Sequence, residues 1–226
     1  MCPSCRHRLH AKDLVPVLSW VELRGKCRYC QAKISWQYPI VELAMASLFI
    51  VSYFHWPYSL TGFGLVVFGL WLVTLVMFVA MTVYDIRWMI LPDRLVLLTT
   101  IAAGLLVLFL GLDTNDIGTI TNSILGGWLL AGIFWVTFQV SDGKWIGGGD
   151  VKLGFGLGLL AGGLLETMLL LFVASLLGTI VGLPLLIKGG RASHKVPFGP
   201  FIISAAIVVF LWGQSIINWY ISLIGV

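Results

Sequence analysis

Seven long apolar stretches follow a polar segment at the start of the chain. They cover residues 38–56, 60–84, 95–112, 117–140, 151–163, 167–187 and 197–223. A membrane-spanning helix needs about 20 predominantly apolar residues, so the pattern predicts about seven transmembrane helices. The fifth stretch is short, and Gly154, Gly158 and Gly162 recur in it at four-residue spacing. Such a stripe favours close packing against another helix, with a flexible or re-entrant segment as the alternative.

The composition agrees with a membrane protein. Of the 226 residues, 59% are hydrophobic and 11% charged, and the mean hydropathy is +0.98. A soluble domain has about 25% charged residues, so the expected fold class is an all-α polytopic membrane protein. No apolar signal sequence follows Met1. We therefore predict two domains, a small polar one over residues 1–37 and a transmembrane one over residues 38–226.

The positive charges predict the topology. If the spans alternate and the N-terminus is cytoplasmic, the C-terminus lies outside and every Lys and Arg is cytoplasmic, as the positive-inside rule requires. The fourteen are Arg6, Arg8, Lys12, Arg24, Lys26, Arg28, Lys33, Arg87, Arg94, Lys144, Lys152, Lys188, Arg191 and Lys195. The net charge of +4 therefore follows the membrane topology, and we expect membrane lipid, and no nucleic acid, as a partner.

Four cysteines form two C-x2-C pairs in the polar segment. Cys2 and Cys5 are separated by twenty-one residues from Cys27 and Cys30. Two such pairs can supply four thiolates to one tetrahedral Zn²⁺, with spacing close to that of zinc ribbons. Two disulfides or a redox C-x-x-C are the alternatives, and a reducing cytosol disfavours disulfides. We predict a structural zinc with no open coordination position.

Two of the ten acidic residues fall at the cytoplasmic edge of the predicted membrane. Asp85 ends the second apolar stretch and Asp150 begins the fifth, which places them at matching depth. A carboxylate there is costly and usually marks function; ion pairs with Arg87 and Lys152 are the alternative. Asp93, directly after Pro92, is predicted to cap a helix.

Three consecutive glycines, Gly147, Gly148 and Gly149, lead directly into Asp150. Backbone without Cβ atoms can take φ > 0 and lie close to another chain. A peptidase must hold its substrate extended against exposed backbone groups. We therefore predict that these glycines position the substrate, with a plain flexible loop as the alternative.

Two carboxyl groups brought together share one proton. The charged one can take a proton from a water between them, while the neutral one hydrogen-bonds the scissile carbonyl. None of the four histidines (His7, His10, His55 and His194) lies beside a plausible nucleophile at membrane depth. The sequence thus predicts an aspartic peptidase that works through Asp85 and Asp150.

The motifs occur in the order seen in one known family. The N-terminal region resembles the cytoplasmic region of type IV prepilin peptidases, and the two aspartates resemble that family's catalytic motifs, the second of the G-x-G-D class. The matching segments are residues 2–5, 13–16, 23–30, 38–43, Asp85 with 91–93, 147–153 and 196–200.

The resemblance implies a multi-pass enzyme of the bacterial plasma (inner) membrane. Such an enzyme removes the basic leader of type IV pilin-like precursors, its partners, on the cytoplasmic side. Many members also N-methylate the new N-terminus with S-adenosylmethionine. Ala46 stands where the family usually has glycine, which bears on methyl transfer, and members have a membrane span before the first cysteine pair.

Other functions remain open from the sequence. A presenilin or signal-peptide-peptidase relative would also suit Tyr84-Asp85 and G-x-G-D, although the cysteine domain disfavours it. A proton-coupled transporter could use paired membrane carboxylates, and a non-catalytic assembly scaffold is a third class. Pilus assembly, protein secretion and DNA uptake (competence) are equally compatible systems.

Overall fold

The computed structural model describes residues 1–187 and 197–225. Its backbone packing divides the chain into two units, Met1–Phe54 and His55–Val226. The helix α2 (Gln37–Phe54) belongs to the first of these units. The proposed functional boundary between residues 37 and 38 falls at the start of this helix and stays a prediction.

The first unit has little regular structure before α2. It contains the 3-10 helix η1 (Ala11–Leu14), the short helix α1 (Leu18–Glu22), and one antiparallel bridge between Lys26 and Lys33. A turn between α1 and that bridge needs Gly25, because its φ is +68° and a Cβ would lie 2.7 Å from the Trp20 ring. The unit therefore has the cysteine pairs of a zinc ribbon but, in its described residues, one bridge in place of a strand ladder.

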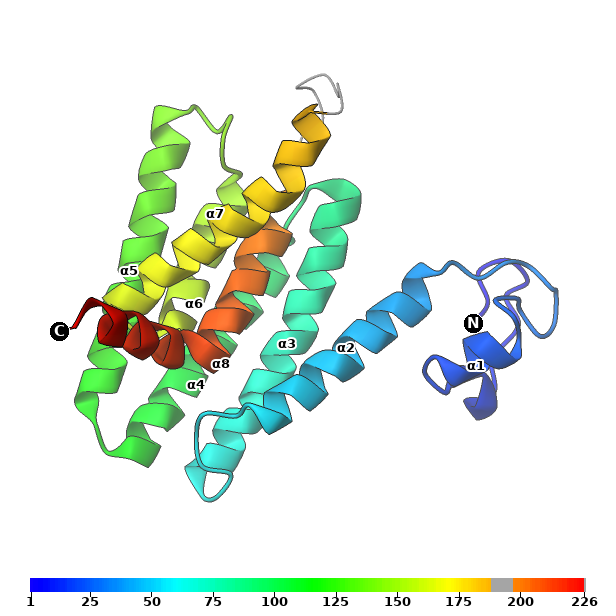
Figure 1. Ribbon diagram of the computed structural model, residues 1–226. Helices are drawn as coiled ribbons and strands as arrows, with labels where there is room; N and C mark the ends of the chain where they lie inside the picture. Colours follow the sequence, from blue (N-terminus) through cyan, green and yellow to red (C-terminus); the bar gives the residue numbers. More distant parts are fainter. Residues whose placement is uncertain (188–196, 226) are drawn as a thin grey trace. The chain divides into compact units, whose positions relative to one another are not determined.

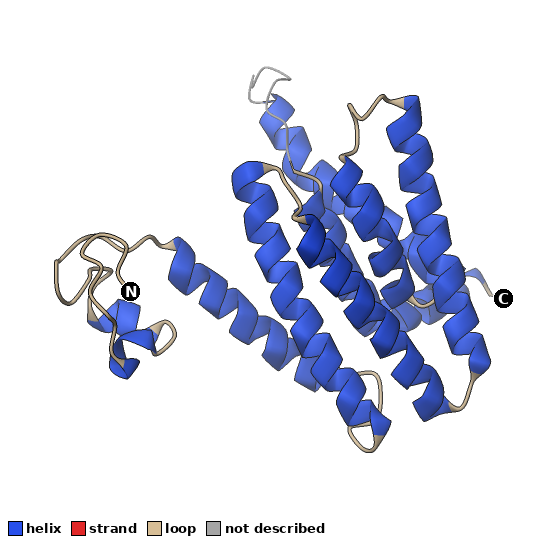
Figure 2. Cartoon of the chain, turned by 180° about the vertical axis from the view of Figure 1, so that it is seen from behind, coloured by secondary structure: helices blue, strands red, loops and turns tan. Residues whose placement is uncertain are grey.

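The second unit is a bundle of helices (Figure 1). Its members are α3 (Phe63–Trp88), α4 (Asp93–Thr114), α5 (Ile117–Val140), α6 (Gly148–Ala161), α7 (Leu164–Ile187) and α8 (Gly199–Ile224). Short turns join α3 to α4, α4 to α5 and α6 to α7. Met89, Asn115 and Gly162 end their helices in the left-handed conformation, and the Asp116 carboxylate caps α5 by accepting hydrogen bonds from two backbone N–H groups. The described chain is helix and loop throughout (Figure 2).

Six described helices are long and apolar enough to cross a membrane: α2, α3, α4, α5, α7 and α8. The all-α polytopic membrane fold is therefore confirmed. The predicted fifth span is α6, whose 14 residues extend about 21 Å at 1.5 Å per residue, less than a hydrocarbon core of about 30 Å. It lies among α4, α5, α7 and α8 and is buried along most of its length. A helix shielded in this way need not match the membrane thickness.

The predicted glycine stripe explains how α6 reaches this position. A Cβ at Gly158 would overlap the carbonyl oxygen of Gly126 in α5, and one at Gly154 would lie 2.9 Å from the Phe134 ring. These two glycines therefore let α5 and α6 pack backbone to backbone, as predicted. The third, Gly162, does not take part: it ends the helix with φ +93° and faces open space.

Candidate active site and cysteine cluster

Asp85 lies near the C-terminal end of α3 and is buried, with 6% of its surface exposed. Its Oδ2 accepts a 3.0 Å hydrogen bond from the backbone N–H of Gly199, the first residue of α8. The bond joins residues 114 positions apart. The burial of Asp85 thus depends on the packing of α8 beside α3.

Asp150 occupies the first turn of α6 and is 8% exposed. Its Oδ2 accepts a 3.2 Å hydrogen bond from the N–H of Gly147. A helix-capping carboxylate makes such a bond, so this contact alone indicates no function. The Oδ1 atom is different, because it is buried and has no hydrogen-bond partner among the described residues. A buried polar atom without a partner is costly and needs another explanation.

Asp85 and Asp150 lie on α3 and α6, respectively. The helices that carry them, α3 and α6, both pack against α4 and α8. Neither aspartate forms an ion pair in the described part of the chain. The alternative that they merely pair with Arg87 and Lys152 is therefore not what the structure has: Arg87 lies over the Trp88 ring, and Lys152 pairs elsewhere.

The partner of Lys152 is Asp93, and this corrects one prediction. Asp93 does not cap α4 with its side chain; it is the first residue of that helix, after Pro92. Its Oδ1 lies 2.7 Å from the Lys152 Nζ, so the pair links the beginnings of α4 and α6. Both side chains are more than half exposed. Because Asp93 is the first residue inside α4 and Pro92 is the N-cap, Asp93 does not occupy the capping position.

The three glycines before Asp150 do not form an extended loop. Gly147 precedes α6, Gly148 and Gly149 begin it, and none of the three has a positive φ. A Cβ at Gly149 would lie 3.0 Å from Leu91, whereas one at Gly148 would make only an ordinary 3.8 Å contact with Phe138. Packing against Leu91 within the protein therefore explains the glycine at position 149. Packing within the protein does not explain the glycine at position 148, where a side chain would have room.

The four cysteine sulfurs of the first unit lie within 4.8 Å of one another, and all four thiols are free. The sulfurs of Cys2 and Cys30 are 3.9 Å apart. Four sulfurs placed about 2.3 Å from a tetrahedral metal would be about 3.8 Å apart. The cluster therefore has the chemistry and dimensions to hold a metal ion.

The two cysteine pairs share one backbone conformation. In each pair the carbonyl of the first cysteine accepts a hydrogen bond from the N–H four residues later: Arg6 to Cys2 (2.8 Å) and Gln31 to Cys27 (3.0 Å). The N–H of the same cysteine donates to the carbonyl five residues later: Cys2 to His7 (3.0 Å) and Cys27 to Ala32 (2.8 Å). Arg6 and Gln31 both have positive φ, 55° and 59°. Two turns of the same form thus present their sulfurs to one point.

Two of the four thiols have pKa values shifted in opposite directions. The N–H groups of Cys5 and Ser4 lower the pKa of the Cys2 thiol to about 6. The Ala32 N–H lowers the pKa of Cys30, but burial and the neighbouring cysteines outweigh it and raise that pKa to about 12. Four thiolates this close repel one another, so a cation is needed before all of them ionise.

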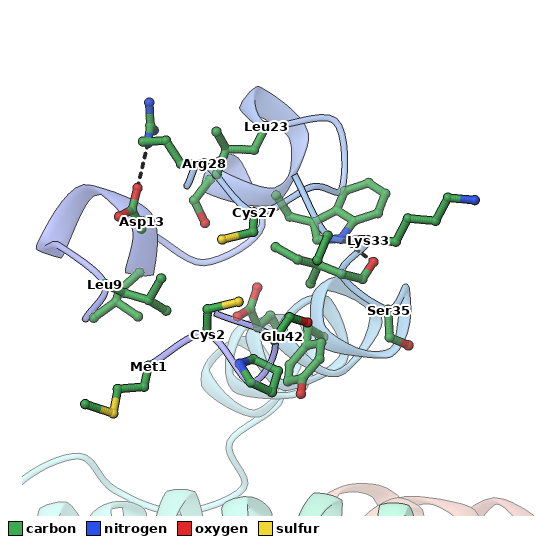
Figure 3. A pocket seen from close by; sticks show the side chains of 18 residues that line it. Met1, Cys2, Leu9, Asp13, Leu23, Cys27, Arg28, Lys33, Ser35 and Glu42 are labelled. Atoms are coloured by element: carbon green, nitrogen blue, oxygen red, sulfur yellow. Dashed lines mark hydrogen bonds and ion pairs between the residues drawn. The ribbon is translucent and has the colours of Figure 1, made fainter. Parts of the chain in front are cut away.

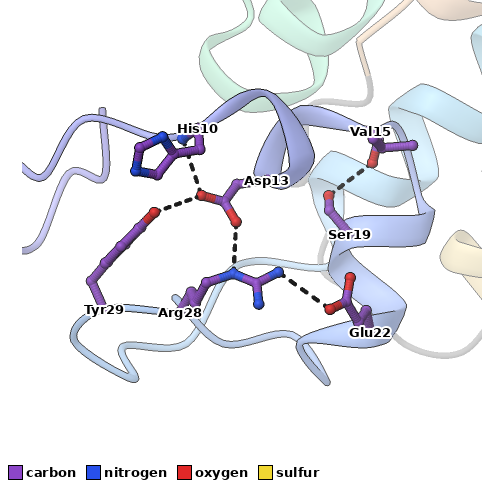
Figure 4. Close-up of polar contacts among 7 residues, drawn as sticks. All are labelled: His10, Asp13, Val15, Ser19, Glu22, Arg28 and Tyr29. Carbon is purple, nitrogen blue, oxygen red and sulfur yellow. Dashed lines mark hydrogen bonds and ion pairs between the residues drawn. The ribbon is translucent and has the colours of Figure 1, made fainter.

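A polar network ties the second cysteine pair to η1 (Figure 4). The buried Asp13 carboxylate accepts hydrogen bonds from Arg28 Nε (2.8 Å), from the Tyr29 hydroxyl (2.9 Å) and from the His10 N–H (3.1 Å). Arg28 also pairs with Glu22 at 3.3 Å. The Arg28 hydrogen bond lowers the pKa of Asp13 to about 2, so the carboxylate is charged at any physiological pH.

A hollow of about 460 Å³ lies beside Cys2 and Cys27 (Figure 3). Its wall includes Asp13, Trp20 and Glu42. The Glu42 carboxylate accepts a 2.7 Å hydrogen bond from the N–H of Val17, whose φ is +60°. Segments that are far apart in the sequence of the first unit therefore line the same hollow.

Comparison with known proteins identifies the family. Residues 1–56 match the bacterial peptidase A24 N-terminal domain, and residues 72–183 match the type IV leader peptidase family. A prepilin leader peptidase/N-methyltransferase of Aeromonas salmonicida is 38% identical over 99% of this chain and 74% of the relative. The chain belongs to the type IV leader peptidase family. The predicted resemblance is confirmed, and the transporter and scaffold alternatives are set aside.

Further leader peptidases are similar over the same extent. Prepilin leader peptidase/N-methyltransferases of Aeromonas hydrophila and Pseudomonas aeruginosa are 36% and 30% identical, over 98% and 99% of this chain and 74% and 75% of those proteins. No solved structure matches the chain. The family and the apolar helices together make the protein a multi-pass inner-membrane protein.

Some residues of this leader peptidase were not found from the sequence. The hydrogen bond between Gly199 and Asp85 has no signal beyond a glycine before Pro200 at the start of a span. The network of Asp13 and Arg28 joins residues fifteen positions apart, and nothing in their spacing marks them as partners. Five residues named in the sequence predictions lie outside the described residues: Lys188, Arg191 and Lys195, His194, and Val196.

Proposed function

We propose that the chain is an intramembrane aspartic endopeptidase that cleaves the leader from type IV pilin-like precursors, with Asp85 and Asp150 as the catalytic pair. The observation that carries this proposal is that both carboxyl groups are buried without an ion pair among the described residues, and that one of them has an unpartnered oxygen. Buried carboxylates are normally compensated by a charge or by full hydrogen bonding. A bound water and the scissile carbonyl are the partners that a peptidase would supply.

In this mechanism the pair holds one proton, because two adjacent carboxylates do not both ionise. The ionised carboxylate takes a proton from the water, whose oxygen attacks the carbonyl carbon of the scissile peptide. The protonated carboxyl donates a hydrogen bond to the carbonyl oxygen and stabilises the tetrahedral intermediate. Breakage of the C–N bond then returns a proton to the leaving amine.

Cleavage of a purified pilin-like precursor in detergent tests this assignment. Asp85→Asn and Asp150→Asn each keep the shape of the carboxyl but remove its acid–base chemistry, so each should lower the turnover number by at least about 10²–10⁴-fold without altering insertion. The matched control is Asp93→Asn, which should stay active because that side chain is exposed and pairs with Lys152. An inactive Asp93→Asn beside an active Asp85→Asn would mean that the pair is assigned wrongly.

For the topology we propose a cytoplasmic N-terminus and an outer C-terminus, with both aspartates at the cytoplasmic edge. The distribution of the fourteen Lys and Arg residues supports it. A single cysteine placed after Gly225 in a variant that keeps the four native cysteines should react with an impermeant thiol reagent added outside intact cells. If labelling exceeds that of wild type only after the membrane is opened, the C-terminus lies in the cytoplasm and the proposed orientation is wrong.

We further propose that the precursor's apolar helix docks laterally against the bundle and that Gly147, Gly148 and Gly149 position the leader junction beside the aspartates. Membrane lipid is then the medium through which the substrate arrives. Gly148→Leu separates this role from internal packing better than Gly149→Leu, because the protein itself leaves space beside Gly148. Cleavage should fall while thermal stability stays. A soluble leader peptide cut as well as the full precursor would contradict lateral docking.

Cys2, Cys5, Cys27 and Cys30 are proposed to hold one structural Zn²⁺, which would fold the first unit and leave no coordination position for catalysis. The sulfur separations and the matched turns support this. Metal analysis of the purified protein should give one zinc per chain, and Cys5→Ser should lose it. A disulfide between these cysteines, or a chain without metal, would refute the assignment.

A second activity, N-methylation of the new N-terminus with S-adenosylmethionine, is proposed from the names of the relatives. The departure at Ala46 gives a direct test, because the family usually has glycine there. Methyl transfer to cleaved precursor should be weaker in this chain than in Ala46→Gly, while leader cleavage stays the same. Equal methylation by both proteins would show that the alanine has no part in it.

A further inference from the structure

The segment around Gly199 holds one of the two aspartates in place. Gly199 is the first residue of α8, and its N–H donates the buried 3.0 Å hydrogen bond to Asp85 Oδ2. The first amides of a helix have no partner within the helix itself. This amide is therefore available to Asp85 at no cost to α8.

The position of Asp85 on its own helix makes that bond valuable. Asp85 lies three residues before Trp88, the last residue of α3, where the helix dipole disfavours a negative charge. The N-terminal end of α8 carries the opposite partial charge. The amide of Gly199 thus offsets the unfavourable end of α3 at the buried carboxyl group.

Position 199 requires glycine because of the space that the Asp85 carboxyl group occupies, and not because of the backbone conformation. Gly199 does not have a positive φ, so its conformation is open to other residues. A Cβ there, however, would overlap Oδ2 of Asp85 and lie 3.1 Å from its Cγ. Only a residue without a side chain allows the amide and the carboxyl group to meet.

We propose that Gly199 is a positioning residue for the aspartate pair: its N–H fixes the orientation of the Asp85 carboxyl group, and its missing Cβ leaves the carboxyl group room. This inference rests on the proposed catalytic role of Asp85. Gly199 touches neither substrate nor water in this scheme and acts only through Asp85. Loss of the bond should therefore affect turnover and spare the binding of the precursor.

Replacing Gly199 with glycolic acid tests the bond without adding an atom in the site. Cell-free synthesis with a chemically acylated suppressor tRNA introduces a backbone ester, which replaces the N–H with an oxygen atom and weakens the preceding carbonyl, of Phe198, as an acceptor. A hydrogen bond to a charged group is worth enough to change a rate by about 10- to 100-fold. The ester protein should lose about that factor in kcat with KM unchanged. A matched ester at Ile117, the first residue of α5, should retain full kcat.

Gly199→Ala adds the steric arm of the test. Displacing Asp85 by about 1 Å should lower kcat about 100-fold. The control is Gly69→Ala in α3, where a Cβ would meet nothing within 4 Å; it should leave cleavage unchanged. Thermal unfolding of each variant reports folding separately.

The outcomes separate this inference from the function on which it rests. If Asp85→Asn is inactive but the ester at Gly199 cleaves at the normal rate, the positioning role is overturned and the aspartate pair stands. If the ester raises KM and lowers the melting temperature together with kcat, Gly199 is structural and the inference also fails. Normal cleavage by Asp85→Asn would remove the proposed catalytic pair itself.

Discussion

The contact between α5 and α6 offers a test of the packing that places Asp150. At Gly158 an added methyl group would overlap the carbonyl oxygen of Gly126 and lie 2.7 Å from the Cα of Gly127. All of these atoms belong to backbone, so no flexible side chain can move aside. The two helices must separate to admit the methyl group.

The size of the effect follows from two opposing terms. Overpacking of a close contact costs about 1–3 kcal/mol, and alanine is a better helix former than glycine by about 1 kcal/mol. Gly158→Ala should therefore destabilise the protein by up to about 2 kcal/mol. Gly132 lies in α5, and a Cβ there would meet nothing within 4 Å. Gly132→Ala should therefore gain only the helix-propensity term and stabilise the protein by up to about 1 kcal/mol.

Unfolding in mixed micelles with increasing SDS measures both variants under one condition. A separation of about 1 Å at Gly158 would also move Asp150, eight residues earlier in α6, and a shift of that size can cost about 100-fold in rate. Gly158→Ala should therefore lose stability and cleavage together. The reasoning is refuted if Gly158→Ala is as stable as Gly132→Ala.

Two further predictions concern ion pairs. Lys152→Met should lower stability by less than about 1 kcal/mol, because its partner Asp93 is exposed, and cleavage should persist; loss of cleavage would place this pair in the active site. In the first unit, the Arg28 hydrogen bond holds the Asp13 pKa at about 2, below the ordinary 3.8, so its stabilisation is complete above about pH 4 and is lost as the pH falls through about 2. Asp13→Asn should therefore be less stable to urea than wild type, measured by intrinsic tryptophan fluorescence, to the same extent at pH 7 and pH 5. Equal stability of the two proteins at pH 7 would contradict this.

The sequence by itself determined the elements whose causes are local. Runs of about 20 apolar residues predicted the long helices, and the two C-x2-C pairs predicted the cysteine cluster, because their spacing lies within one short segment. The glycines at positions 154 and 158 indicated a close helix contact in the same way. The family followed from motifs that lie in order along the chain.

The tertiary structure decided the contacts between the ends of different helices. Asp93 was expected to cap its own helix, but the position of α6 offered it Lys152 instead. A plain flexible loop was the alternative for the glycines before Asp150, yet the first turn of α6 includes two of them and packs Gly149 on Leu91. The amide of Gly199 reaches Asp85 across 114 residues. No local pattern encodes such a contact, because it arises only when the apolar faces of several helices are buried together.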